Sequence, residues 1–227
     1  MQSIGSEKDR WISTKQKLAE DKLSLLGDMV MATAFVNYLG PFEGTYRIKI
    51  LTDTWQKLNA KYQLKYTYDF ALKDILGDVE KISEWSLRGL PNENMAYENM
   101  IIIDETIETK YPVLIDPEGQ AHRYMRDNVG VDSEQTSADN QNRLCVKASS
   151  PNVTKQLQVA LQSGSIVLCE SAGEVTHPAL LAILRKDLST IQGELYINFN
   201  DMNIEFDADF RIYMFSHLSN PHFSPEV

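Results

Sequence analysis

The sequence has only two cysteines, Cys145 and Cys169, among 227 residues. By themselves they are too few for a disulfide framework or a zinc site. Both lie in apolar runs, which indicates buried thiols in a reducing compartment. The chain also lacks the pattern of a secretory signal peptide, because residues 1–10 are polar and have no apolar central run.

Long apolar runs are absent as well. The most apolar window, Leu23 to Leu39, has 17 residues and contains Asp28 and Asn37. A membrane-spanning helix needs about 20 mostly apolar residues. We therefore expect no membrane among the partners of this chain.

Basic residues are scarce relative to acidic ones. The chain has 22 Lys and Arg against 32 Asp and Glu, for a net charge of −10. The imbalance falls in residues 89–227, which hold 9 basic and 20 acidic residues. A surface that binds nucleic acid must attract phosphates. We therefore expect no nucleic acid partner.

What is present is enough apolar material for a core, at 43% of the residues. A chain of this length forms one large domain, or one and a half small ones. The pattern of apolar residues divides it into a helical first part and a second part in which short strands alternate with helices.

A long helix is predicted over residues 7–39. Apolar residues recur at every seventh position, namely Trp11, Leu18, Leu25, Ala32 and Leu39. The positions four residues after these, which would widen the apolar seam along the helix, are charged in the first half (Lys15, Lys22) and apolar in the second (Met29, Val36). A thin seam is typical of a helix that meets one partner helix, and a broad one of a helix buried in a domain. The change is predicted near Gly27, although an ordinary amphipathic core helix remains the alternative.

Further helices are predicted over residues 41–90, after Gly40-Pro41 ends the first. The second begins near Thr45, and apolar residues step along it by three and four. These residues are Ile48, Leu51, Trp55, Leu58 and Tyr62. A third begins with Asp69 as its cap, breaks at Gly77, and restarts with Asp78 as the cap.

Beyond residue 95 the pattern is that of an α/β fold. Strands are predicted at Ile101–Ile103, Pro112–Ile115, Arg143–Lys147, Ile166–Cys169 and Phe210–Phe215. Ser150-Pro151 and Thr176-His177-Pro178 open helices, the latter reaching Leu188. Tyr196–Phe199 and Met202–Phe206 form a hairpin, and residues 128–142 a polar loop. Alternating strands and helices predict parallel strands with helices on both faces.

Ligands of such a sheet bind beyond the carboxyl ends of its strands. The first candidate there is the loop Asp116-Pro117-Glu118-Gly119-Gln120-Ala121-His122. A phosphate-binding loop would need Gly-Lys-Ser/Thr at its end, but none of the 11 glycines in the chain is followed by Lys. The loop instead places Asp116 and Glu118 where an anion would bind. This predicts that the loop does not bind nucleotide.

The second candidate is Glu170-Ser171, which follows four apolar residues. This pattern resembles a Walker B strand, whose acidic residue helps to hold magnesium. Ser171 stands where hydrolytic enzymes often have a Glu that orients water, and a hydroxyl serves poorly as that base. The alternative is a buried strand that ends in a solvated Glu.

The third candidate is Ser216-His217, at the end of the last strand. A polar group there could sense a γ-phosphate, but polar strand ends are common. His217 and His222 have no neighbouring cysteine or acid, so no metal site is expected. His122 and His177 are expected to form hydrogen bonds near helix starts. We predict no catalytic residues, since no nucleophile elbow or carboxylate pair stands out.

Several segments resemble dynein heavy chains at their fifth AAA+ module. Tyr111-Pro112-Val113-Leu114-Ile115-Asp116-Pro117-Glu118-Gly119-Gln120-Ala121 carries the most specific likeness. The other segments follow in the family's order, and together they cover nearly the whole chain. They are Leu26-Gly27-Asp28, Phe35–Phe42 with Tyr46-Arg47, Trp85–Pro91 with Glu98-Asn99, Phe210–Met214 and Ser219–Val227.

The resemblance implies a fragment of a microtubule motor whose six AAA+ modules form a ring. It implies an AAA+ (P-loop NTPase-like) large subdomain with a four-stranded parallel sheet in the order 1-4-3-2, an inserted hairpin, and Pro112–Ile115 at an edge. Residues 1–40 would be the end of the stalk segment, 41–90 a helical entry region, and 91–227 the large subdomain. The small subdomain would be absent.

The resemblance also implies that this module holds no cofactor, while ATP and magnesium bind at other modules of the heavy chain. The degenerate site would comprise Asp116–His122, Glu170, Ser171 and Ser216. Expected partners are neighbouring AAA+ modules, the stalk and linker, other dynein subunits, and microtubules through the stalk. The expected location is the cytoplasm and cytoskeleton, or the axoneme of a cilium or flagellum.

Two alternatives remain. One is a nucleotide-binding AAA+ module with an atypical P-loop, which would hold an anion at the helix N-terminus after Gly119. The other is a standalone interaction domain that uses the thin seam of the first helix to bind a partner.

Overall fold

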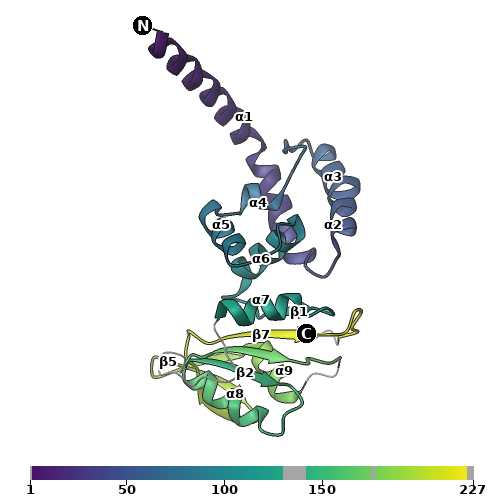
Figure 1. The fold of residues 1–227 in the computed structure, drawn as a ribbon, viewed down its shortest axis with the longest axis vertical. Coiled ribbons are helices and arrows are strands. Elements are labelled where there is room, and N and C mark those ends of the chain that lie inside the picture. Colours follow the sequence, from purple (N-terminus) through teal and green to yellow (C-terminus); the bar gives the residue numbers. More distant parts are fainter. Residues whose placement is uncertain (1, 130–141, 175–176, 224–227) are drawn as a thin grey trace. The chain divides into compact units, whose positions relative to one another are not determined.

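The computed structural model describes residues 2–129, 142–174 and 177–223 (Figure 1). The chain divides into two compact units, Met1–Glu105 and Thr106–Val227. Most of the predicted loop 128–142 lies outside the described residues, as do Thr176 and the last four residues of the segment Ser219–Val227.

The first unit is helical, as predicted. Its elements are α1 (Gln2–Tyr38), α2 (Gly44–Ile50), the π-helix η1 (Leu51–Trp55), α3 (Gln56–Lys61), α4 (Leu72–Ile75), α5 (Val79–Leu87) and α6 (Asn94–Thr106). Asp78 caps α5, as predicted, by accepting a hydrogen bond from the Glu80 N–H at 2.8 Å. Asp69 caps no helix, since α4 begins three residues later, after the extended residue Ala71.

The predicted change in the seam of α1 is confirmed. Side chains from Glu7 to Leu23 are exposed, and the first buried position is Gly27. Trp11 is 67% exposed, whereas Leu39 is 1% exposed. The second half of α1 therefore supplies the core of the first unit, where it packs with Leu51, Leu72 and Ile101.

Gly27 and Asp28 begin the buried half because another segment passes close to α1 there. A Cβ atom on Gly27 would lie 2.2 Å from the carbonyl oxygen of Lys65. The Asp28 carboxylate accepts hydrogen bonds from the N–H and the hydroxyl of Thr67, both at 2.7 Å. A larger residue at position 27 would push this segment away.

Arg47 joins three segments of the first unit. Its guanidinium is almost fully buried and donates to the carbonyls of Phe42 and Gly40, at 2.8 and 2.9 Å. It also pairs with Glu98 at 3.0 Å and donates to the Asn99 side chain at 2.6 Å. Two of the resembling segments, distant in sequence, thus meet at one ion pair.

The predicted apolar face of the second helix is mostly exposed. Leu51 is buried on the inner side of α2, η1 and α3 together with the polar residues Arg47, Gln56 and Asn59. Ile48, Leu58 and Tyr62 face solvent. The π-helix η1 accounts for Leu58 and Tyr62, because its wider turn rotates the residues that follow it relative to an α-helical pattern. Ile48 precedes η1 and is exposed because the buried side of α2 is the one that carries Arg47.

The predicted strand Ile101–Ile103 is wrong, because these residues lie within α6. A short run of β-branched residues cannot be assigned to strand or helix by periodicity alone. Here only Ile101 is buried, against the second half of α1, while its two neighbours are partly exposed.

The second unit contains the predicted parallel sheet. Its strands are β1 (Val113–Ile115), β2 (Arg143–Lys147), β3 (Ile166–Glu170) and β7 (Arg211–Ser216). They lie in the order β1-β7-β3-β2, and every neighbouring pair is parallel. This is the predicted order 1-4-3-2, with β1 at an edge. An α/β fold of the AAA+ type, preceded by a helical region, is therefore confirmed.

Helices cover both faces of this sheet (Figure 1). Helix α7 (Gln120–Val129) covers one face through Met125, which packs on Leu168 and Phe215. Helices α8 (Val153–Gln162) and α9 (Pro178–Arg185) cover the other. That second face holds the main core, with Leu157, Val167 and Ile212 fully buried.

A separate antiparallel sheet contains the predicted hairpin, β5 (Glu194–Phe199) and β6 (Met202–Glu205). A third strand, β4 (Leu188–Ile191), pairs with β5. The prediction that Leu188 continues the helix is wrong. Lys186 ends α9 in the left-handed conformation, and the chain then turns into β4.

Among the residues that the structure describes, none of the helices is both long enough and apolar enough to cross a lipid bilayer.

Candidate functional site at the carboxyl ends of the parallel strands

The carboxyl ends of β1, β7 and β3 meet at one edge of the sheet. The N–H of Asp116, just after β1, donates to the carbonyl of Ser216 at 2.8 Å. The N–H of Ala172, two residues after β3, donates to the carbonyl of Phe215 at 2.9 Å. These bonds bring together the three predicted candidate segments.

Asp116 fills the N-terminus of α7 with its own side chain. Its two carboxylate oxygens accept hydrogen bonds from the N–H groups of Gln120 and His122, at 2.9 and 2.8 Å. The residue is only 6% exposed. The first N–H groups of a helix form a natural site for an anion. In this chain the carboxylate of Asp116 already occupies that place.

The turn before α7 depends on Gly119. Its φ of +70° lies in the left-handed region, which glycine adopts without strain. Its N–H donates to the carbonyl of Asp116 at 3.2 Å. Pro117 and Glu118 are exposed on this turn, and the Glu118 carboxylate accepts a bond from the Gln120 side chain at 2.8 Å. The turn therefore presents an acidic group to solvent.

Ala121 and His122 face the sheet from the first turn of α7. Ala121 packs with the cluster of Met125, Leu168 and Phe215. The ring of His122 stands edge-on to that of Phe215, with centroids 4.9 Å apart. This places His122 Nε2 3.0 Å from an oxygen of Glu170.

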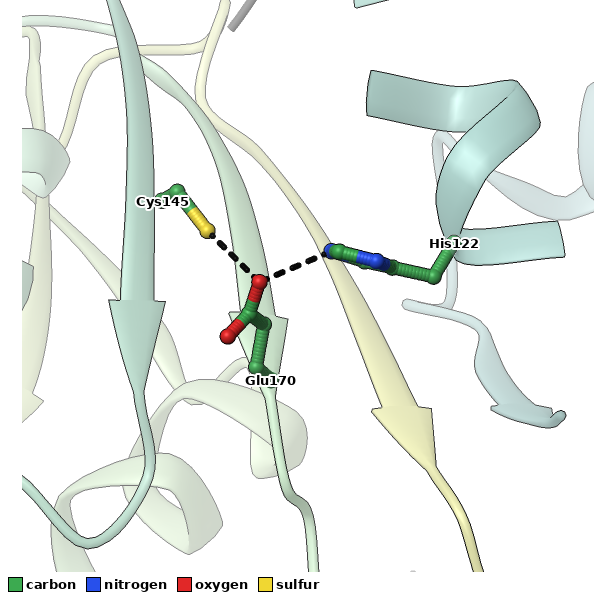
Figure 2. A group of neighbouring side chains, drawn as sticks. All are labelled: His122, Cys145 and Glu170. Carbon is green, nitrogen blue, oxygen red and sulfur yellow. Dashed lines mark hydrogen bonds and ion pairs between the residues drawn. The ribbon is translucent and has the colours of Figure 1, made fainter. Parts of the chain in front are cut away.

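Glu170 lies close to two side chains (Figure 2). Its Oε1 atom lies 3.0 Å from His122 Nε2 and accepts a hydrogen bond from the Cys145 thiol at 3.3 Å. Burial, and then the adjacent Glu170 carboxylate, raise the pKa of Cys145 to about 11. The thiol is therefore protonated at neutral pH. Glu170, predicted at the position of a Walker B acid, is held by neighbouring side chains.

The two candidate serines differ in their surroundings. Ser171 is exposed and has a φ of +59°, an uncommon value for a residue other than glycine. Ser216 is fully buried, and its hydroxyl accepts a bond from the Leu218 N–H at 3.4 Å. His217 Nδ1 lies 3.2 Å from the Asp116 carbonyl, so the end of β7 is tied to the loop after β1.

His177 makes the hydrogen bond that was predicted near a helix start. Its Nδ1 accepts from the Ala179 N–H at 3.2 Å and caps α9. His122 also lies at a helix start, as predicted, but its side chain is directed to Glu170 across the sheet edge. Its nearest polar partner is therefore a strand residue.

Cys145 is the part of the site that sequence reasoning missed. Cys145 and Glu170 lie on neighbouring strands, with Cys145 opposite Leu168 and Lys147 opposite Glu170. Residues two apart on a strand share a face, so the thiol and the carboxylate both lie on the face that α7 covers. The predicted strand order carried this signal, but the two residues are 25 positions apart in sequence.

Comparison with known proteins matches two regions of the chain. Residues 83–227 match the family described as the ATP-binding dynein motor region. Residues 1–58 match the family described as the microtubule-binding stalk of dynein motor. The first match covers more than half of the chain.

Individual relatives agree with this assignment. Dynein axonemal heavy chain 2 of Mus musculus is 32% identical over 224 residues, and dynein axonemal heavy chain 1 of Homo sapiens is 32% identical over 225. Dynein axonemal heavy chain 3 of Mus musculus is 33% identical over 225 residues. Each match covers 99% of this chain and 5% of the relative. This chain belongs to the dynein heavy chain family.

Proposed function

We propose that this chain is part of a microtubule motor, and that its α/β unit is a nucleotide-free, force-transmitting module of the motor's AAA+ ring. We place it at the fifth module, at the base of the stalk. The observation that carries the proposal is the Asp116 carboxylate at the N-terminus of α7, bonded to the Gln120 and His122 N–H groups.

The physical reason is electrostatic repulsion. A nucleotide-binding AAA+ module would use the N–H groups of this loop and helix to bind phosphate oxygens. A triphosphate here would have to displace a buried carboxylate, or approach that negative charge closely. The side chain of Glu118 adds a second negative charge, and no lysine follows Gly119 to offset them. Phosphate binding at this loop is therefore unfavourable.

The helical region supports a place beside the stalk. Residues 1–58 match the family described by its microtubule-binding stalk. The first half of α1 exposes Trp11, Leu18 and Leu25 along one heptad seam. A seam of this kind suits a second helix that packs alongside. We assign that partner to the other helix of the stalk, and microtubule binding to the distal part of the same stalk.

The names of the relatives support a location. The similar proteins reported above are axonemal heavy chains, which favours a cilium or flagellum. The remaining partners would be neighbouring AAA+ modules, the linker, and other dynein subunits. ATP and magnesium would bind at other modules of the heavy chain.

One rival function is favoured by a specific finding. The matching family is described as ATP-binding, so this module could bind nucleotide through an atypical loop. Thermal unfolding of the chain with and without magnesium-ATP separates the two. We expect neither ATP nor ADP to shift the unfolding temperature. If the module bound nucleotide, a nucleotide concentration of 100 times the Kd would stabilise the fold by about 2.7 kcal/mol, which is easily detected.

Magnesium with tripolyphosphate is the control for nonspecific ionic effects. A concentration-dependent stabilisation by ATP that tripolyphosphate does not reproduce would refute the nucleotide-free role. It would establish the rival.

A further inference from the structure

Three side chains of the types that bind metal ions converge where the sheet meets α7 (Figure 2). They are His122 from the first turn of α7, Cys145 from β2, and Glu170 from the end of β3. The His nitrogen, the Cys sulfur and a Glu carboxylate oxygen all lie within 4.8 Å of one another. They come from three different elements of one folded unit, so the fold itself assembles the cluster.

The histidine nitrogen directed into this cluster lacks a satisfactory partner. Nε2 of His122 is buried, and among the described residues no group forms a well-aligned hydrogen bond with it. It lies 3.0 Å from Glu170 Oε1, but that contact is poorly directed. A buried polar atom without an aligned bond costs stability unless another ligand satisfies it.

We propose that His122, Cys145 and Glu170 bind a Zn²⁺ ion, with water as the fourth ligand. This inference goes beyond the proposed function, because three side chains can bind zinc whether or not the module is free of nucleotide. The ion would tie α7 to β2 and β3. The sequence alone pointed away from a metal, since these residues lie 23 and 25 positions apart.

The distances suit zinc after a small adjustment. Zinc binds nitrogen and oxygen at about 2.0–2.2 Å and sulfur at about 2.3 Å, so tetrahedral ligand atoms stand roughly 3.3–3.8 Å apart. Glu170 Oε1 now lies 3.0 Å from the His122 nitrogen and 3.3 Å from the Cys145 sulfur. A rotation of the flexible Glu170 side chain would lengthen these two contacts by the few tenths of an ångström required. The His122 nitrogen and the Cys145 sulfur lie within 4.8 Å of each other, so they would have to approach by up to about 1 Å to share the ion.

Zinc binding here is a proton exchange with no change in oxidation state. The Cys145 thiol loses its proton to solvent, the resulting thiolate binds Zn²⁺, and the Glu170 carboxylate supplies a second negative ligand. The protein ligands then offset the charge of the ion. The high pKa of the free thiol means that zinc must compete with a proton for the sulfur.

The ligand types select zinc over magnesium. Magnesium prefers octahedral oxygen ligands, whereas a thiolate and an imidazole with one carboxylate suit zinc. The same geometry argues against a cysteine nucleophile. Glu170 contacts both the thiol and the imidazole, and the raised pKa of Cys145 keeps the thiol protonated.

The experiment is a titration of the purified 227-residue chain with Zn²⁺ and, in parallel, with Co²⁺ as a spectroscopic probe. We expect one equivalent to bind, with a thiolate-to-cobalt charge-transfer band and the visible bands of a tetrahedral ion. His122→Gln, Cys145→Ser and Glu170→Gln should each weaken Zn²⁺ binding at least about 100-fold, beyond the effect typical of outer-shell partners. Cys145→Ser should also abolish the charge-transfer band.

A double variant, Cys169→Ala with His222→Gln, removes one cysteine and one histidine outside the cluster and should bind like the parent chain. Circular dichroism without metal identifies variants that fail to fold, and those that do fold decide the outcome. Binding that survives all three cluster substitutions, or no charge-transfer band in the parent chain, would overturn the proposal. No nucleotide is present, so this result is independent of the ATP test.

Discussion

The two units of this chain achieve order in different ways. The α/β unit buries a continuous apolar core between its sheet and helices α8 and α9. The helical unit has a smaller apolar core and places Arg47, Gln56, Asn59 and Asp28 among its buried residues. It also leaves large apolar side chains exposed on the first half of α1 and on α2 and α3.

The difference indicates what each unit still requires. Exposed apolar seams along a helix are typical of surfaces that a partner covers. Buried polar residues such as Arg47 fix the geometry of segments that apolar packing alone would leave free. We therefore expect the α/β unit to behave as a rigid block and the helical unit as a connector. Four substitutions test this contrast.

The largest effect is expected from Phe210→Ala in the α/β unit. Phe210 is fully buried and packs edge-on against Tyr111 and Phe206. The free energy of unfolding should fall by about 3–5 kcal/mol, because removal of the ring leaves a cavity in a packed core. All three tryptophans lie in the helical unit, so amide hydrogen exchange of residues 106–223 is the suitable measurement. A loss below 1 kcal/mol would contradict a rigid core.

The next largest effect is expected from Arg47→Met in the helical unit, which should lower the free energy of unfolding by about 3 kcal/mol. The substitution leaves Glu98 and two carbonyls without their partner, and breaking a buried pair is strongly destabilising. Urea unfolding followed by tryptophan fluorescence reads this unit. Lys57→Met, which removes an exposed pair with Asp53, is the control and should change little. Equal losses of stability in the two variants would show that the buried contacts of Arg47 do not hold the segments of the helical unit together.

Asp116→Ala should cost about 1.5–3 kcal/mol, the range for hydrogen bonds to a charged acceptor. The substitution leaves the Gln120 and His122 N–H groups without their carboxylate. Exchange of these two amides should accelerate in particular. Glu118→Ala, on the same turn but exposed, is the matched control. If the amides of α7 keep their protection in Asp116→Ala, the carboxylate does not cap the helix.

The smallest effect is expected from Leu18→Ala on α1, within about 0.5 kcal/mol, because the side chain is exposed. Leu39→Ala, on the same heptad seam but buried, should cost about 2–5 kcal/mol. Tryptophan fluorescence during urea unfolding reads both variants. A large loss for Leu18→Ala would mean that the exposed seam is already packed in the isolated chain.

Much of the fold could be predicted from the sequence. The charged partner positions of α1 indicated where burial begins, and the resemblance gave the strand order. Periodicity failed for the short run Ile101–Ile103, which fits either a strand or a helix. It also gave the wrong buried face beyond Leu51, where the π-helix η1 rotates the apolar residues of the following helix α3 to the surface. Such a turn has no simple sequence signature.

Most residues of the site could be predicted from the sequence, Cys145 being the exception, but their contacts could be predicted only in part. The acidic loop predicted unfavourable phosphate binding, and the structure adds that Asp116 itself occupies the helix N-terminus. The meeting of Cys145, His122 and Glu170 depends on strand register and on the path of α7 across the sheet. These are tertiary features that spacing along the chain does not encode.

The most direct test of the central claim is equilibrium dialysis of the chain against labelled ATP with magnesium. We expect no specific binding at millimolar ATP, because the Asp116 carboxylate fills the place of a phosphate. The same dialysis of the Asp116→Ala variant shows whether removal of the carboxylate lets the freed Gln120 and His122 N–H groups bind a phosphate. Saturable, stoichiometric binding of ATP by the unmodified chain would contradict the account.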